Sequence, residues 1–175
     1  DNVYQAVVSL RPAESPSFIQ YEEGSEEPLQ NFERIIERIG RHPDVEVVGL
    51  SYYSLPYTFS NMGDGIRRDS IRLNVRNMMV SPDYLQVFGI HSAEGESPEE
   101  MARKLSELVS TKDLMISGEL ARSLFDRTDI LGKEVYMSGD SIPKRIVVVT
   151  EPVRNDEYDA GDMNVFFTRM DLTAM

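Results

Sequence analysis

The hydrophobic pattern predicts one amphipathic helix close to the start of the chain. From Pro28 to Ile39, apolar residues recur every three or four positions and charged residues occupy the opposite face. Gly40 comes next and is suited to end the helix. Alternating apolar positions in Val3–Leu10 and the valine-rich segment Asp44–Tyr53 predict a strand on each side of it, giving a β-α-β unit. We expect the core of this unit to contain Val8, Phe32, Ile36 and Val47.

Farther along the chain, strand patterns alternate with helix patterns. Strands are expected at Ser70–Arg76, which runs on into Met78–Val80, and at Asp113–Ile116, Lys133–Met137, Lys144–Thr150 and Met163–Arg169. The segment Met62–Gly65 carries two glycines and indicates a turn. A turn at Ser138–Ser141 joins two of the strands into a hairpin. A hairpin argues against a purely parallel sheet, so the predicted fold class is α+β.

The segment Val80–Ile90 predicts a short helix that carries its own start and stop signals. Ser81 is suited to cap it, Pro82 fits the first helical position, and Gly89 is able to end it in the left-handed conformation. The remaining side chains are mostly apolar, which indicates a helix wedged into a core. Two more helices are predicted to start after the capping residues Ser97 and Ser117.

Composition and charge narrow the classes of protein and of partner. Hydrophobic residues make up 41% of the chain, with nine Pro and eleven Gly, which is typical of a globular protein. The formal net charge of −12 repels nucleic acid, so nucleic acid is not an expected partner. The sequence contains no cysteine, which excludes disulfides, thiolate catalysis and cysteine-based zinc sites. A strand pattern begins almost at Asp1, so we expect flanking sequence in the natural protein.

The sequence shows no catalytic machinery and predicts no cofactor. His42 and His91 each follow a predicted helix end, where an imidazole interacts favourably with the helix dipole. Serine-nucleophile, zinc-protease and phosphate-loop motifs do not occur. The acidic segment Asn155–Asp162 offers oxygen ligands but lacks the order of an EF-hand loop. An acidic surface loop is the favoured interpretation of it and a weak calcium contact is the alternative, so no metal site is predicted.

An aromatic cluster is the densest candidate for a partner-binding surface. It contains Tyr52, Tyr53, Tyr57 and Phe59, interrupted by Pro56. Rigid aromatic side chains dominate the binding energy of many interfaces, so this segment is a candidate for partner contact. The alternative, which the pattern favours, is that these side chains cover the core at the end of a strand.

Several motifs, in order, resemble one family. Val80–Ile90 resembles the signature V-S-P-x-Y-(F/L)-x-x-(F/L)-G-I of the extracytoplasmic core domain of MacB-type, FtsX-like ABC transporter permeases. Leu114–Phe125 and Ile130–Val135 are similar to the next two motifs of that family, and Lys144–Val153 is similar to its following strand. The resemblance assigns structural roles to Ser81, Pro82, Tyr84, Phe88, Gly89, Ala121, Phe125 and Gly132.

The resemblance implies a two-lobed α+β fold. Residues 1–69 and 151–175 would form a porter-like β-α-β lobe, and residues 70–150 a smaller mixed α/β lobe of the kind called Sabre. Family members usually continue beyond the point that corresponds to Met175, so the porter-like lobe is expected to be incomplete at its C-terminus. His91–Ser97 departs from the family pattern because it lacks the usual arginine, and Val148 or Val149 stands where a glycine is usual.

The resemblance also implies a function without catalysis. Such a domain lies on the extracytoplasmic face of the bacterial cytoplasmic membrane, in the periplasm, as part of a membrane-anchored permease. It couples ATP-driven motion to an extracytoplasmic substrate or adaptor. The implied partners are a second permease protomer in a homodimer and a cytoplasmic ATPase subunit or domain. The alternative from another class is an independent secreted binding module for a cationic ligand or protein, which the net charge suggests.

Overall fold

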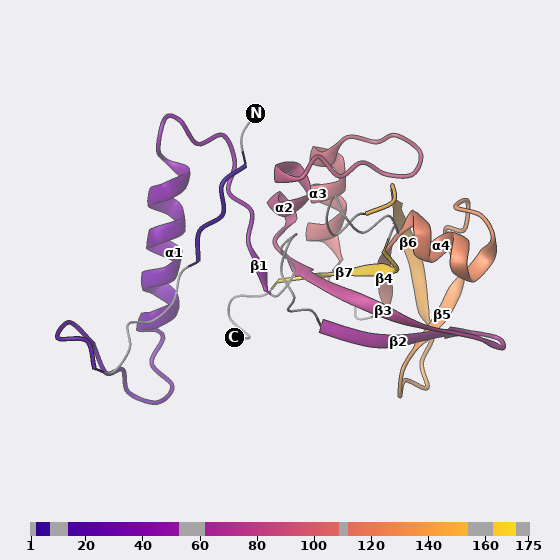
Figure 1. The fold of residues 1–175 in the computed structure, drawn as a ribbon, viewed down its shortest axis with the longest axis horizontal. Coiled ribbons are helices and arrows are strands. Elements are labelled where there is room, and N and C mark those ends of the chain that lie inside the picture. The colour runs from indigo at the N-terminus through magenta and orange to yellow at the C-terminus, as the bar shows by residue number, and fades with distance from the viewer. Residues whose placement is uncertain (1–2, 8–13, 53–61, 109–111, 154–162, 171–175) are drawn as a thin grey trace. The chain divides into compact units, whose positions relative to one another are not determined.

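The computed structural model describes residues 3–7, 14–52, 62–108, 112–153 and 163–170. The chain divides into two compact units, Asp1–Val48 with Leu172–Met175, and Gly49–Asp171 (Figure 1). Among the described residues, the first unit contains one helix and the second contains a mixed sheet with three helices. The predicted combination of helices and a sheet is therefore confirmed. Within the described part of the chain, no helix is both long enough and apolar enough to cross a membrane.

The helix of the first unit is α1 (Glu27–Gly40). It matches the predicted helix closely, with Pro28 in its first turn and a chain turn at Arg41 directly after it. Its apolar stripe is not enclosed, since none of its residues is buried within the described structure. Ile35 and Ile39 remain 42% and 37% exposed. The predicted helix is thus confirmed, but within the described structure no closed core lies beneath it.

The β-α-β prediction for residues 1–53 is wrong in the part of it that the structure describes. Residues 3–7 and 44–50 carry no strand, and only Ser51–Tyr52 is extended as β1. Of the expected core, Phe32, Ile36 and Val47 are half-buried, and Val8 lies outside the described residues. An alternating pattern becomes a strand only when a second strand pairs with its backbone groups. Among the described residues of this unit, no such strand is present.

The second unit contains a seven-stranded sheet in the order β1-β3-β2-β5-β6-β4-β7. The strands after β1 are β2 (Met62–Arg68), β3 (Ile71–Val80), β4 (Asp113–Ser117), β5 (Glu134–Met137), β6 (Lys144–Thr150) and β7 (Val165–Arg169). Strand β7 pairs with β4 and also with β3, so the ladder from β3 through β2, β5, β6, β4 and β7 returns to its first strand. The predicted hairpin is confirmed as the antiparallel pair β5–β6, and β4–β6 and β3–β7 are parallel.

The segment Met62–Gly65 is not a turn. It forms the first half of β2, which pairs along its whole length with β3 and at its end with β5. Glycine weakens a strand, but here the neighbouring strands β3 and β5 both pair with the backbone of β2. A Cβ at Gly65 would lie 3.1 Å from the Cβ of Ser138, so the small residue suits close packing on the β5–β6 turn.

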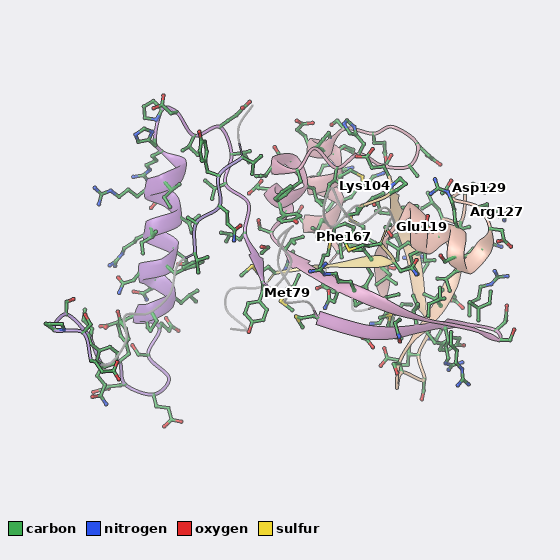
Figure 2. All side chains as sticks on the ribbon, in the orientation of Figure 1. Met79, Lys104, Glu119, Arg127, Asp129 and Phe167 are labelled. Atoms are coloured by element: carbon green, nitrogen blue, oxygen red, sulfur yellow. The ribbon has the colours of Figure 1, made fainter. Side chains whose placement is uncertain are left out.

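Three helices complete the second unit: α2 (Pro82–Val87), α3 (Pro98–Glu107) and α4 (Gly118–Phe125). They pack into two hydrophobic cores: α4 contributes to the first, and α2 and α3 contribute to the second. Strand β4 separates the cores, because Leu114 and Ile116 belong to the first and Met115 to the second. Phe167 of β7, labelled in Figure 2, is 1% exposed in the second core.

The observed division of the chain differs from the expected lobe boundaries. A boundary between residues 69 and 70 would cut the β2–β3 hairpin, whose register runs from Met62 opposite Asn77 to Arg68 opposite Ile71. A boundary after residue 150 would remove β7, which pairs with two strands of the same sheet. These two hydrogen-bonded ladders place both segments in the second unit. The division instead falls after Val48 and after Asp171.

Candidate functional site

The family-like segment Val80–Ile90 joins three parts of the second unit. Ser81 has the extended backbone of a helix cap, but its hydroxyl makes no bond to α2. That hydroxyl instead accepts the backbone N–H of Leu50 at 2.8 Å, and the Ser81 N–H donates to the Leu50 carbonyl at 2.9 Å. The expected capping role is therefore corrected. Ser81 extends the short pairing of β1 with β3 by one residue.

Gly49 lies directly against the first turn of α2. A Cβ at this position would lie 2.7 Å from Tyr84 Cα, closer than real Cβ atoms approach other atoms, and 3.0 Å from Tyr84 N. The backbone at Gly49 therefore follows its path because this residue has no side chain. Gly49 is not among the predicted site residues, although a glycine inside a valine-rich segment is a known sign of close backbone approach.

Val80 is hydrogen-bonded to the C-terminal end of the second unit. Its carbonyl accepts the backbone N–H of Met170 at 2.8 Å, just before the division of the chain after Asp171. Leu50, bound to Ser81, comes two residues after the division at Val48. The chain thus enters and leaves this unit next to two consecutive residues: Leu50 is hydrogen-bonded to Ser81, and Met170 to Val80. We call Val80 and Ser81, with the hydrogen bonds to Leu50 and Met170, the Val80–Ser81 junction.

The rest of the segment anchors this junction in the core. Tyr84 and Leu85 are buried at 2% and 0% exposure, and Phe88 packs on Tyr84 with ring centroids 4.4 Å apart. Pro82 lies in the first turn, as expected. Gly89 has φ +60, which confirms its predicted left-handed conformation, and Ile90 N donates to the Leu85 carbonyl at 2.8 Å. The segment is therefore a buried, well-terminated helix.

Burial also shifts the pKa values of Tyr84 in α2 and of Arg76 in β3. It raises the pKa of the Tyr84 hydroxyl well above its ordinary value, and the neighbouring Arg76 guanidinium opposes this only in part. Burial likewise lowers the pKa of Arg76. Tyr84 is therefore neutral in the folded protein at physiological pH.

The second family-like motif is held by one buried serine. Ser117 caps α4 as predicted, accepting the Leu120 N–H at 3.3 Å, and it also accepts the Val165 N–H at 3.2 Å and donates to the Met163 carbonyl at 2.9 Å. Ala121 is fully buried, and Phe125 packs at the edge of the same core. Gly132, with φ +80, makes the turn before β5. These residues fix α4 onto the sheet.

Of the aromatic cluster, the structure describes one member. Tyr52 lies at the edge of the sheet, is 39% exposed, and is paired with Met79, which is labelled in Figure 2. Tyr53, Tyr57 and Phe59 lie outside the described residues. Whether this cluster contacts a partner or covers the core therefore stays a prediction.

In the described part of the chain, the two histidines contact backbone groups or acidic side chains and are not gathered with other metal-binding residues. The backbone N–H of His91 donates to Glu151, and its Nδ1 lies 3.2 Å from the Glu96 carbonyl. His42 lies on the surface near Asp44. Among the described residues, no three His, Asp or Glu side chains come together as metal ligands do. The acidic segment 155–162 lies outside the described residues.

Comparisons with known proteins find the fold but no sequence relative. No family model matches the sequence, and no curated protein matches it. Among solved structures, the extracellular domain of the noncanonic ABC-type transporter YknZ from Gram-positive bacteria is 17% identical, with a TM-score of 0.50. The match covers 78% of this chain and 61% of that one.

The periplasmic region of MacB from Actinobacillus actinomycetemcomitans is 11% identical, with a TM-score of 0.51, and the match covers 78% of this chain and 54% of that one. The chain thus spans between half and two-thirds of the domains that it matches. Both are extracytoplasmic parts of ABC transporters, which is the group that the motifs resemble. The chain therefore has the fold of the extracytoplasmic domains of MacB-type ABC transporter permeases.

Proposed function

We propose that this chain is a non-catalytic extracytoplasmic domain of an ABC transporter permease. The observation that carries the proposal is the fold shared with the YknZ and MacB domains, together with the order of motifs along the sequence. In this proposal the domain belongs to a membrane-anchored protein on the outer face of the bacterial cytoplasmic membrane. Its partners are a second permease protomer and a cytoplasmic ATPase, fused or separate, and it faces a substrate or adaptor outside the membrane.

The Val80–Ser81 junction supports a coupling role. Motion is transmitted through a protein when the moving segment is fixed to a rigid element, because packed cores shift between discrete arrangements rather than deforming continuously. Here both passages of the chain out of the second unit are bonded to residues that continue into the buried helix α2. A displacement of either passage would therefore move α2 and the core around Tyr84 with it.

The two units correspond in this proposal to the two lobes implied by the resemblance. Gly49–Asp171 would be the Sabre-like lobe, and the unit containing α1 would be part of the porter-like lobe. The apolar stripe of α1 fits this assignment, because an apolar stripe that is not buried within the described structure is typical of a surface that contacts another part of an assembly.

The proposal is tested on the full-length protein in proteoliposomes with its ATPase. Ser141 is exposed on the β5–β6 turn, and this part of the protein has no cysteine, so Ser141→Cys gives a single labelling site in the domain. We expect the rate of maleimide labelling at this site to change about twofold or more when ATP is added, because the domain moves with the ATPase cycle.

Ser81→Ala should reduce this ATP-dependent change while ATP hydrolysis continues, because the substitution removes a bond of the junction and leaves the motor untouched. Ser106→Ala is the matched control, since the hydroxyl of this exposed residue donates to the Arg103 carbonyl within α3. Equal labelling rates with and without ATP in the unsubstituted Ser141→Cys protein would contradict a coupling role. Recovery of the protein in a soluble secreted fraction would favour the independent binding module.

A further inference from the structure

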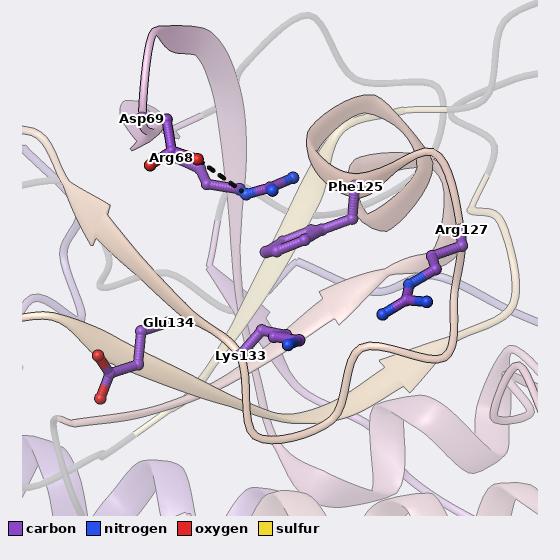
Figure 3. A pocket seen from close by; sticks show the side chains of 6 residues that line it. All are labelled: Arg68, Asp69, Phe125, Arg127, Lys133 and Glu134. Carbon is purple, nitrogen blue, oxygen red and sulfur yellow. Dashed lines mark ion pairs between the residues drawn. The ribbon is translucent and has the colours of Figure 1, made fainter.

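A charged hollow lies in the second unit, away from the Val80–Ser81 junction. It has a volume of about 430 Å³ and is lined by Arg68, Asp69, Phe125, Arg127, Lys133 and Glu134 (Figure 3). These residues come from the β2–β3 turn, the end of α4, and the segment that leads into β5. Three of the six are cations in a chain whose net charge is −12. We propose that this hollow binds a small organic anion, with its oxyanion between Arg127 and Lys133 and its apolar body on Phe125.

One wall of the hollow is fixed in place by Arg68. Its Nη1 donates to the Leu124 carbonyl at 2.6 Å, at the C-terminal end of α4, where carbonyl groups lack helical partners. This bond holds the guanidinium over the Phe125 ring, 4.2 Å from the ring centroid. The guanidinium of Arg68 is therefore already bonded to protein groups, and it keeps the Phe125 ring in position beside the hollow.

The other two cations of the lining, Arg127 and Lys133, are the groups that would bind an anionic ligand. In Figure 3 the guanidinium of Arg127 and the ammonium of Lys133 are directed toward one another beneath the Phe125 ring. Arg127 has a loose ion pair through Nε, 3.4 Å from Asp129. The Lys133 ammonium has no ion-pair partner among the residues that the structure describes. Two cations that converge on one space repel each other, and an oxyanion between them would relieve that repulsion.

The two carboxylates of the lining do not occupy this space. Asp69 pairs with Arg68, 3.4 Å from its Nε, on the far side of the Phe125 ring (Figure 3). Glu134 follows Lys133 directly in the chain, and its carboxylate is directed away from the Lys133 ammonium in the same view. The negative charges thus lie at the margin, and the centre of the hollow is lined by two cations and an aromatic ring.

This combination selects a chemical class of ligand. A carboxylate accepts hydrogen bonds from an arginine and a lysine together, and a flat apolar group next to it packs on an aromatic ring. A hollow of this size is at the lower end of the range for small-molecule sites, about 300–1,000 Å³. The proposal does not depend on the transport function, since it rests on these six residues alone.

The test is an NMR titration of the chain with benzoate, and separately with acetate, at low ionic strength. Both probes carry one carboxylate, and only benzoate carries a ring. We expect benzoate to shift the backbone signals of residues 125–134 with a saturable curve, and to bind about threefold or more tighter than acetate. Lys133→Gln and Arg127→Gln should each weaken benzoate binding by about threefold to fivefold.

Arg38→Gln is the matched control, because Arg38 is an exposed cation of α1 in the other unit. It should leave the benzoate affinity within about the error of the titration. The proposal is overturned if the shifts do not saturate, if acetate binds as tightly as benzoate, or if Arg38→Gln weakens binding as much as the two substitutions in the hollow. Unchanged binding in both Lys133→Gln and Arg127→Gln, each verified as folded by its NMR spectrum, would also overturn it.

Discussion

At the scale of single residues, two glycines of the second unit are needed for different physical reasons. Gly89 has a positive φ, and a Cβ there would meet nothing within 4 Å, so a substitution would cost backbone strain alone. Gly49 has no such φ, but a Cβ there would collide with the backbone of Tyr84. Backbone atoms of a helix cannot move aside as a side chain can. Gly49 is therefore the more restrictive of the two positions.

We expect Gly49→Ala to lower the free energy of unfolding by about 1–3 kcal/mol, the usual cost of inserting an extra methyl into a packed site. Gly63→Ala is the control, because a Cβ at Gly63 in β2 has nothing within 4 Å. Urea unfolding followed by circular dichroism measures both. Equal stability of Gly49→Ala and the parent would show that the chain does not lie against α2.

The buried hydroxyl of Tyr84 predicts a dependence of stability on alkaline pH. Burial raises its pKa in the folded protein, so the neutral form is favoured by folding. This contribution is complete below the tyrosine pKa of the unfolded chain, about 10, and is lost as the pH rises above that value.

Urea unfolding at about pH 9 and pH 11 should therefore show a larger loss of stability in the parent than in Tyr84→Phe. Other groups titrate in both proteins, so their effect cancels in the comparison. An identical loss in the two proteins would be inconsistent with a buried, neutral Tyr84.

At the scale of elements, Ser117 links α4 to β7. Its hydroxyl makes three hydrogen bonds to backbone groups, one in α4, one in β7 and one at Met163 just before β7, and the residue is fully buried. Ser117→Ala would leave two N–H groups and one carbonyl without this partner. We expect a loss of about 1–3 kcal/mol, the cost of leaving buried polar groups unsatisfied.

Hydrogen exchange should locate this loss, with faster exchange of the Leu120 and Val165 amides than in the parent. Ser97→Ala is the comparison, since Ser97 caps α3 on the surface by accepting the Glu100 N–H at 3.4 Å. An equal effect of the two substitutions would mean that Ser117 acts only as a cap.

The elements also show which signals in the sequence determine structure locally. Helices α1, α2, α3 and α4 were predicted because their proline, serine and glycine signals act within a few residues of each other. Strand β2 was missed because its two glycines resemble a turn, and its pairing with β3 and β5 is decided by distant residues. The segment 44–49 has a strand composition but no partner strand among the described residues. Pairing, unlike capping, cannot be read from one segment.

The candidate site shows the same limit. The sequence identified Val80–Ile90 as informative, and its Pro82, Tyr84, Phe88 and Gly89 lie as expected. The hydrogen bonds of Ser81 to Leu50 and of Val80 to Met170 join residues far apart in the chain, so no local pattern contains them. The same holds for the hollow around Phe125, whose lining comes from three separate segments.

At the scale of the whole molecule, the chain combines one sheet-based unit with two buried cores and one unit whose helix has no buried residue in the described structure. The chain also covers only part of the domains whose fold it shares. The fold shared with the YknZ and MacB domains is what supports the proposal of an extracytoplasmic transporter domain. The central claim is that this domain lies outside the cytoplasmic membrane and belongs to a membrane-anchored protein.

Cysteine labelling of the full-length protein in cells tests that claim most directly. The exposed residue Ser141 is replaced by cysteine, and cells are treated with a maleimide that does not cross the cytoplasmic membrane. The protein without this substitution gives the background. The account predicts labelling in intact cells whose outer permeability barrier, where present, has been opened, with the labelled protein in the membrane fraction. Labelling only after the cytoplasmic membrane is lysed, or labelled protein recovered free of the membrane, would contradict the account.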